Sequence, residues 1–129
     1  MLNFIRSRGS IDAGLPFSDA VRAGDVLYLS GALGVTPGTI KLVSGGIESE
    51  TRQIMQNVAH TLEQNGLSLD DVFKCTVMLA DMNEWRAFNA VYLEYFKPDR
   101  LPSRSAFGAA GLALGARAEV ECWAWMGAK

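Results

Sequence analysis

The chain has 129 residues, of which 49% are hydrophobic and 20% are charged, and its formal net charge at pH 7 is −2. This length predicts one domain, residues 1–129, with a hydrophobic core of its own. The acidic balance argues against a nucleic-acid or anionic-lipid partner. No stretch approaches the roughly 20 consecutive apolar residues of a membrane span, and the opening "MLNFIRSRGS" lacks the apolar centre of a signal peptide, so we expect a cytoplasmic protein.

The first predicted strand covers residues 25–35. Apolar residues alternate with other residues from Val26 to Ser30, as in a strand with one buried face, and Gly31 ends the regular pattern. Residues 36–46 are rich in turn formers, which predicts a loop.

The middle of the chain is predicted to hold two amphipathic helices with a strand between them. Helical periodicity covers residues 48–65, and an alternating pattern covers residues 71–79. Asp81 and Glu84 have the spacing of a capping box at the start of the second helix, which Pro98 ends. The residues expected on the buried sides of the two helices are Thr51, Ile54, Met55, Val58, Leu62, Trp85, Phe88, Tyr92 and Phe96.

The last predicted strand, residues 116–125, has two different faces. One face is small and apolar, which suits helices packed on a sheet, whereas the other combines carboxylates with indoles that are poorly suited to solvent. The first set is Ala118, Val120, Cys122 and Ala124, and the second is Arg117, Glu119, Glu121, Trp123 and Trp125. Two helices can cover only one side of a sheet, so we expect another copy of the chain to cover the other.

The two cysteines and the single histidine are interpreted as structural. Cys75 and Cys122 have neither CxxC spacing nor histidine neighbours, so we expect no metal site. Both lie in apolar, strand-like stretches and are predicted core residues of a protein from a reducing compartment. His60 has no partners for catalysis and is predicted to be a partly exposed helix residue.

The segment "LPSRSAF" (Leu101–Phe107) places one arginine between two serines in a stretch that we expect to be buried. The planar guanidinium of Arg104 could hold a carboxylate through two parallel hydrogen bonds. Glu119, on the following strand, is then the candidate to position and deprotonate a water molecule beside it. The structural alternative is that Arg104 pairs with Glu119 or Glu121, because ion pairs outnumber catalytic sites.

Several pieces of the chain, taken in order, resemble the RidA (YjgF) family of enamine/imine deaminases. The most specific piece is the P-x-R-S segment around Arg104, followed fifteen residues later by the first glutamate of E-x-E, Glu119. The others are "LPFS", "VLYLSG", "LEQNGLSLDDV", "DMNEWRAFNAVYLEYF" and "ARAEVE", and together they cover nearly the whole chain.

The resemblance implies an α+β, chorismate-mutase-like fold with a mixed sheet and two helices packed on one face. It further implies a homotrimer with active sites between subunits, and hydrolysis of imines such as 2-iminopropanoate to a 2-oxo acid and ammonia without a cofactor or metal. By position, Arg104 matches the residue that binds the substrate carboxylate and Glu119 the acid that handles the water. Ser30 and Asn89 match polar residues that line the cleft.

The chain departs from the family pattern at two positions. Phe17 in "LPFS" replaces a frequent tyrosine, which removes a hydroxyl from the pocket and leaves room for a more apolar substrate side chain. Ala106 replaces a frequent cysteine, which has little effect if the main chain binds the substrate at that position.

Two other functions remain open at this stage. A non-catalytic trimer could bind 2-oxo acids or related small carboxylates through Arg104, although retention of Glu119 argues against binding alone. A nuclease, an activity also attributed to members of this family, is disfavoured by the sequence pI near 5.3 and the absence of a basic patch.

Overall fold

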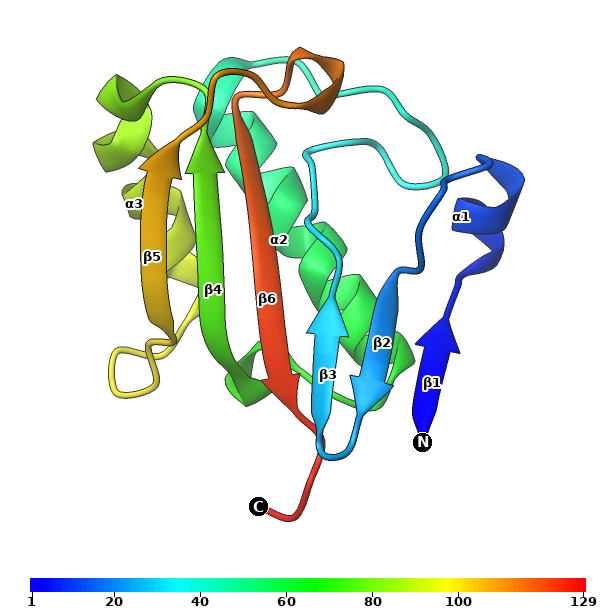
Figure 1. Ribbon diagram of the computed structural model, residues 1–129. Coiled ribbons are helices and arrows are strands. Elements are labelled where there is room, and N and C mark those ends of the chain that lie inside the picture. Colours follow the sequence, from blue (N-terminus) through cyan, green and yellow to red (C-terminus); the bar gives the residue numbers. More distant parts are fainter.

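The computed structural model describes residues 1–129 and contains one six-stranded sheet with helices packed behind it (Figure 1). The strands are β1 (Leu2–Ile5), β2 (Ala20–Ala23), β3 (Val26–Leu29), β4 (Val72–Leu79), β5 (Ser103–Gly108) and β6 (Ala118–Trp125). Their order across the sheet is β1-β2-β3-β6-β4-β5. β4 and β5 run parallel and every other neighbouring pair runs antiparallel, so the predicted mixed sheet is confirmed.

Two helices, α2 and α3, cover one face of the sheet, as predicted. The helices are α1 (Arg8–Asp12), α2 (Gly46–Gln64) and α3 (Trp85–Tyr92). Figure 1 shows α2 and α3 behind the sheet and the short α1 beside the β1 edge. α2 packs against both β6 and α3. None of the helices combines the length and the apolar character that crossing a bilayer needs.

The core lies between this helical layer and the sheet. The four residues of β6 predicted to face the helices are fully buried, each with 0% of its surface exposed: Ala118, Val120, Cys122 and Ala124. The predicted apolar stripe of α2 is buried against them, and its one hydroxyl, on Thr51, donates 2.7 Å to the carbonyl of Ile47. Cys75 and Cys122 are confirmed as core residues, and His60 is exposed as predicted.

The segment around Arg104 is not buried, and the expectation of a buried stretch at residues 101–107 is wrong. β5 is the last strand of the sheet and pairs only with β4. Ser103, Ser105 and Phe107 are exposed, whereas Arg104 and Ala106 are partly buried on the other face. An edge strand has no second neighbour to cover it, and no part of the chain lies over its open face.

The strand predicted over residues 25–35 is regular only as far as Leu29. Tyr28 pairs with Trp123 and Ala32 bridges to Val120. Between these two pairs the chain advances four residues after β3 but only three along β6. This extra residue makes a bulge around Ser30 and Gly31, and bulges are frequent beside functional sites.

The start of α3 also differs from the prediction. Asp81 accepts a hydrogen bond of 2.9 Å from the backbone N–H of Asn83, but the following turn is a 3-10 helix over Met82–Glu84. Glu84 does not complete a capping box, because its carboxylate accepts 2.9 Å from Arg117. The α-helix ends at Tyr92, before Pro98.

The short elements at the N-terminus were not predicted. β1, α1 and β2 each span only four or five residues. Their sequence has little periodicity, since most of their residues stay at least partly exposed at the edge of the sheet.

Candidate functional site

Arg104 projects toward the helical side of the sheet. It lies opposite Cys75 in the parallel β4–β5 pair, and Cys75 faces the helices. The guanidinium carbon lies 4.8 Å from the ring centroid of Tyr92 and 5.8 Å from that of Phe88, both on α3. Aromatic rings at these distances attract the cation and hold its side chain in place.

No carboxylate of the chain neutralises Arg104. It takes part in none of the ion pairs or side-chain hydrogen bonds of the structure. The predicted alternative, a structural pair with Glu119 or Glu121, is therefore wrong within one chain. A partly buried guanidinium with all of its donors free is suited to a carboxylate from outside the chain.

Two buried polar atoms on α3 also lack partners. They are the side-chain oxygen of Asn89 and the hydroxyl of Tyr92. The two residues are three positions apart, so they lie on the same side of the helix. Burial raises the pKa of the Tyr92 hydroxyl well above its usual value, and the neighbouring Cys75 raises it further. Tyr92 is therefore a neutral donor beneath Arg104.

Glu119 lies on the opposite face of the sheet. Its neighbour Val120 is fully buried toward the helices, so Glu119 points to the open face of β6. Strand β4 also separates β6 from β5. Within one chain the structure therefore does not bring Glu119 and Arg104 together.

The Glu119 carboxyl is packed against the backbone of the bulge at Gly31. A methyl group added at Gly31 would overlap Oε2 of Glu119 and would lie 2.9 Å from its Cδ. Burial raises the pKa of the Glu119 carboxyl above its usual range, and the negative charge of Glu121 raises it further. A carboxyl with a raised pKa and no hydrogen-bond partner in the chain is suited to accept and return a proton.

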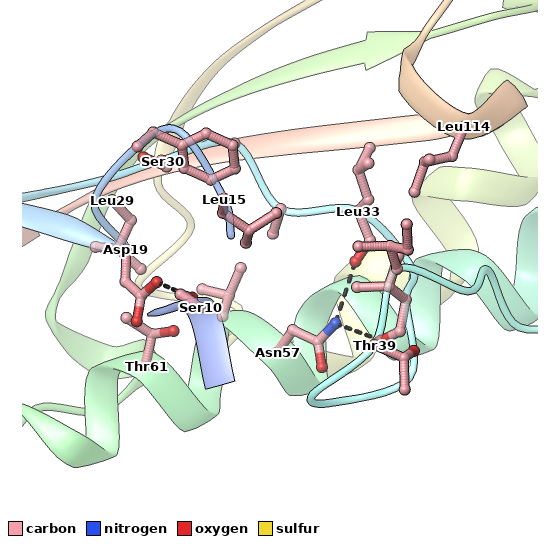
Figure 2. A pocket seen from close by; sticks show the side chains of 16 residues that line it. Ser10, Leu15, Asp19, Leu29, Ser30, Leu33, Thr39, Asn57, Thr61 and Leu114 are labelled. Atoms are coloured by element: carbon pink, nitrogen blue, oxygen red, sulfur yellow. Dashed lines mark hydrogen bonds between the residues drawn. The ribbon is translucent and has the colours of Figure 1, made fainter. Parts of the chain in front are cut away.

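Ser30 and Phe17 line one cavity at the bulge where Gly31 meets Glu119, away from Arg104. The Ser30 hydroxyl donates 2.6 Å to the carbonyl of Ser18, which ties the bulge to the segment before β2. Phe17, 48% exposed, lines with Ser30 and Gly31 the cavity drawn in Figure 2.

The predicted site residues thus form two separate groups. Arg104, Ala106 and Asn89 lie where β5 meets α3. Glu119, Ser30 and Phe17 lie where β6 meets the bulge after β3.

The open face of the sheet carries Trp123 and Trp125, as the sequence predicted, together with the aromatic side chains of Tyr28 and Phe4. Trp123 packs edge-on against Tyr28, with ring centroids 5.0 Å apart, and the Lys74 ammonium lies 4.1 Å from its ring. Trp125 is 41% exposed and Phe4 is 66% exposed. No part of the chain covers this face.

Sequence reasoning missed three residues of the two groups. The alternating pattern marks Gly31 only as the end of a strand, although a glycine in a strand pattern also signals a bulge or a close approach. The helical stripe predicts Tyr92 in the core, and nothing in the pattern links its ring to Arg104. Leu114, which lines the cavity near Phe17, has a left-handed backbone with φ of 62°, a conformation that a leucine does not predict.

Comparison with known proteins identifies the family. The family model described as endoribonuclease L-PSP matches residues 8–126. The chain belongs to this family.

Relatives in the family carry deaminase names. The chain is 38% identical over 112 residues to human 2-iminobutanoate/2-iminopropanoate deaminase, covering 87% of this chain and 81% of that protein. It is 39% identical over 107 residues to the chloroplastic Reactive Intermediate Deaminase A of Arabidopsis thaliana, covering 83% of this chain but 57% of the longer plant protein. The predicted membership in the RidA (YjgF) family is therefore confirmed.

Solved structures of family members have the same fold. A Yersinia pestis protein described as a conserved Rid family member of unknown function superimposes with a TM-score of 0.89 and 32% identity, covering 97% of this chain and 99% of that one. Escherichia coli TdcF with bound serine superimposes with a TM-score of 0.84 and 26% identity, covering 97% of this chain and the whole of that one.

Proposed function

We propose that the protein hydrolyses 2-imino acids, or the enamines in equilibrium with them, to 2-oxo acids and ammonia without a cofactor or metal. The observation that carries the proposal is the unpaired guanidinium of Arg104, held on the rings of Tyr92 and Phe88 with no carboxylate of its own. Such a group lacks a structural reason within the chain and has the chemistry to bind a substrate carboxylate.

In the proposed reaction Arg104 fixes the substrate and Glu119 moves the protons. The carboxylate of Glu119 takes a proton from a water molecule as its oxygen attacks the imine carbon, and returns that proton to the nitrogen, which gives a carbinolamine. The carboxylate then takes the hydroxyl proton of the carbinolamine and delivers it to the amino nitrogen, the C–N bond breaks, and ammonia leaves as the carbonyl forms. The raised pKa of Glu119 supports this double role, because the group can hold a proton at a pH nearer to neutral than an ordinary carboxyl can.

We propose that each site forms between two copies of the chain, in a homotrimer of chorismate-mutase-like fold. Arg104 and Glu119 face opposite sides of the same sheet, so one copy would supply the guanidinium and the next the carboxylate. The uncovered aromatic face with Trp123 and Trp125 supports such an assembly, because exposed indoles gain from burial against a partner. Sites between subunits would also give the free donors of Arg104 and the unpaired side-chain oxygen of Asn89 a common ligand.

The names of the relatives support an imine substrate. The human relative is a 2-iminobutanoate/2-iminopropanoate deaminase, and the Escherichia coli relative binds serine, which like a 2-imino acid has a carboxylate next to a carbon bonded to nitrogen. The two free, buried cysteines support a reducing compartment, and we propose the cytoplasm.

Two other functions have weaker support. A binding module for 2-oxo acids would use Arg104 but has no need of the partly desolvated Glu119 carboxyl. The family description names an endoribonuclease, yet the net charge of −2 and the carboxylates Glu119 and Glu121 on the open face would repel a nucleic-acid backbone.

The proposal is tested by generating imines in situ from amino acids with an amino-acid oxidase and following their decay. The protein should accelerate the decay, whereas Arg104→Ala and Glu119→Gln should abolish most of the acceleration while remaining folded. Arg86→Ala, which removes an exposed arginine of α3 without a side-chain partner, is the matched control and should behave as the wild type. Equal decay with and without the wild-type protein would refute the enzyme; retention of 2-oxo acid binding in that case would favour the binding module.

A further inference from the structure

Two buried thiols face each other across strands β4 and β6. Cys75 and Cys122 are directly opposite in the antiparallel register of these strands, and their sulfur atoms lie 3.3 Å apart, in contact as a thiol–thiol hydrogen bond. Both cysteines are free and fully buried. The proposed deamination uses neither of them, so that reaction does not explain why they are in contact.

The position of the pair in the sheet allows a disulfide. Residues directly opposite in an antiparallel sheet have Cα atoms about 4.5–5.5 Å apart, within the range of about 4.4–6.8 Å that disulfides span. To bond, the two sulfur atoms must approach from 3.3 Å to about 2.05 Å, which is a movement of roughly 0.6 Å for each. The chain brings no third histidine, cysteine, aspartate or glutamate to the pair that would complete a metal site.

The two thiols differ in their readiness to ionise. The hydrogen bond with Cys122 lowers the pKa of the Cys75 thiol, and the positive charge of Arg104 lowers it further. The same hydrogen bond, together with burial, raises the pKa of the Cys122 thiol. Because the thiolate is the form that attacks an oxidant, Cys75 is the nucleophile of the pair and Cys122 is the thiol that reacts second.

The edge of the sheet gives an oxidant its route to Cys75. Cys75 lies directly opposite Arg104 on β5, which is an edge strand and pairs only with β4. Segments with few neighbours open locally at a lower free-energy cost than the centre of a core. Opening of β5 brings the Cys75 sulfur within reach of a molecule as small as hydrogen peroxide. Cys122 has no such route, because β6 lies between β3 and β4.

We propose that Cys75 and Cys122 are a peroxide-reactive dithiol that closes to a disulfide between β4 and β6. The Cys75 thiolate attacks one oxygen of hydrogen peroxide, the O–O bond breaks, and a sulfenic acid forms while the released hydroxide takes up the thiol proton to give water. The Cys122 sulfur then attacks the Cys75 sulfur, the S–O bond breaks, and a second water leaves as the S–S bond forms. The dithiol loses two electrons and the peroxide gains them.

Closure of the disulfide acts on the residue that holds Arg104, and this part of the inference rests on the proposed function. The Tyr92 ring lies 4.8 Å from the guanidinium carbon, and the Tyr92 hydroxyl neighbours Cys75. When the Cys75 sulfur moves toward β6 it leaves that hydroxyl, and a close-packed core transmits the shift to the ring. Substrate binding at Arg104 should weaken as a result. Oxidases that make 2-imino acids from amino acids also release hydrogen peroxide, so substrate and oxidant would arise together.

The first test follows the thiols of the native protein during several hours in millimolar hydrogen peroxide. Free thiols, counted after denaturation, should fall from two per chain to none, and mass spectrometry should show the loss of two hydrogen atoms and a peptide link between Cys75 and Cys122. Dithiothreitol should restore both thiols. In Cys122→Ala the reaction should stop at a sulfenic acid on Cys75 that dimedone traps, whereas Cys75→Ala should give little adduct. Unreacted thiols, or oxidation without the link, would overturn the dithiol.

The second test compares the reduced and oxidised wild type on an oxidase-generated imine, with catalase present to remove new peroxide. Oxidation should raise KM by roughly threefold or more, since small displacements at a binding group are costly, and should change kcat less; dithiothreitol should reverse the change. Cys75→Ala exposes the same methionines to peroxide but cannot close the link, so its own KM should survive the treatment. An unchanged KM in the fully cross-linked wild type would overturn the effect on Arg104. Absence of imine hydrolysis by the reduced protein would overturn the proposed function, while the thiol count still decides the dithiol.

Discussion

A single methyl group at Gly31 should disable the proposed enzyme through Glu119. The added Cβ of Gly31→Ala would overlap Oε2 of Glu119 and lie 2.9 Å from its Cδ, so the carboxyl must move by roughly an ångström to restore van der Waals contact. A displacement of that size at a catalytic group costs about 100-fold in rate. The fold should tolerate it, because the side chain that moves is partly exposed and its carboxyl has no hydrogen bond to lose.

The assay is kcat/KM on an oxidase-generated imine together with thermal melting. Gly111→Ala makes the same chemical change where nothing lies within 4 Å and should match the wild type in both measurements. Because the proposed effect passes through Glu119, Gly31→Ala should cost little further activity in a Glu119→Gln background. An unchanged rate for Gly31→Ala, or an equal loss in both backgrounds, would refute this account.

Three further outcomes are expected. Arg104→Lys should lower kcat/KM by at least about tenfold, because an ammonium cannot make the two-pronged contact. Arg104→Ala should lower the free energy of unfolding by no more than about 2 kcal/mol, since it removes only contacts with aromatic rings. A large loss of stability with full activity would contradict both expectations. Because the pKa of Glu119 is raised in the folded chain, its protonation stabilises the fold at low pH, and this stabilisation is lost as the pH rises through that pKa. Glu119→Gln should therefore melt no lower than the wild type at neutral pH. A clear drop in its Tm would instead indicate that Glu119 forms a structural ion pair. Sedimentation should give a trimer at micromolar concentration, and a stable monomer would remove the basis for a site shared between subunits.

Sequence patterns predicted the elements whose two faces differ strongly. In β6, small apolar residues alternate with carboxylates and indoles. This alternation alone predicts that Val120 faces the helices and that Glu119 faces the open side of the sheet. The stripe of α2 was equally clear. In these elements the hydrophobic effect alone decides the orientation.

The orientation of Arg104 could not be predicted in the same way. In the sequence Ser103–Gly108 neither face is distinctly apolar, so the pattern does not say which side chains point to the helices. Pairing with Cys75 decides it, and that contact joins residues far apart in the chain. The family motif named the right arginine, but only the parallel pairing of β4 and β5 places it across the sheet from Glu119.

The left-handed backbone of Leu114 lies outside sequence reasoning for a related reason. Gly111 and Gly115 mark a turn, but which residue of the turn takes φ of 62° depends on how the loop joins β5 to β6. The cavity beside it is built by four separate segments, and no one of them shows a pattern that belongs to a pocket.

The separation of Arg104 and Glu119 on opposite faces of the sheet has a genetic consequence in the proposed assembly. A chain that lacks the arginine still offers its glutamate to one neighbour, and a chain that lacks the glutamate still offers its arginine to the other. Two inactive alleles of these kinds, expressed together, would form mixed oligomers in which some interfaces hold both wild-type residues. Loss-of-function alleles would therefore sort into two complementing groups within one gene, one group for each face of the sheet.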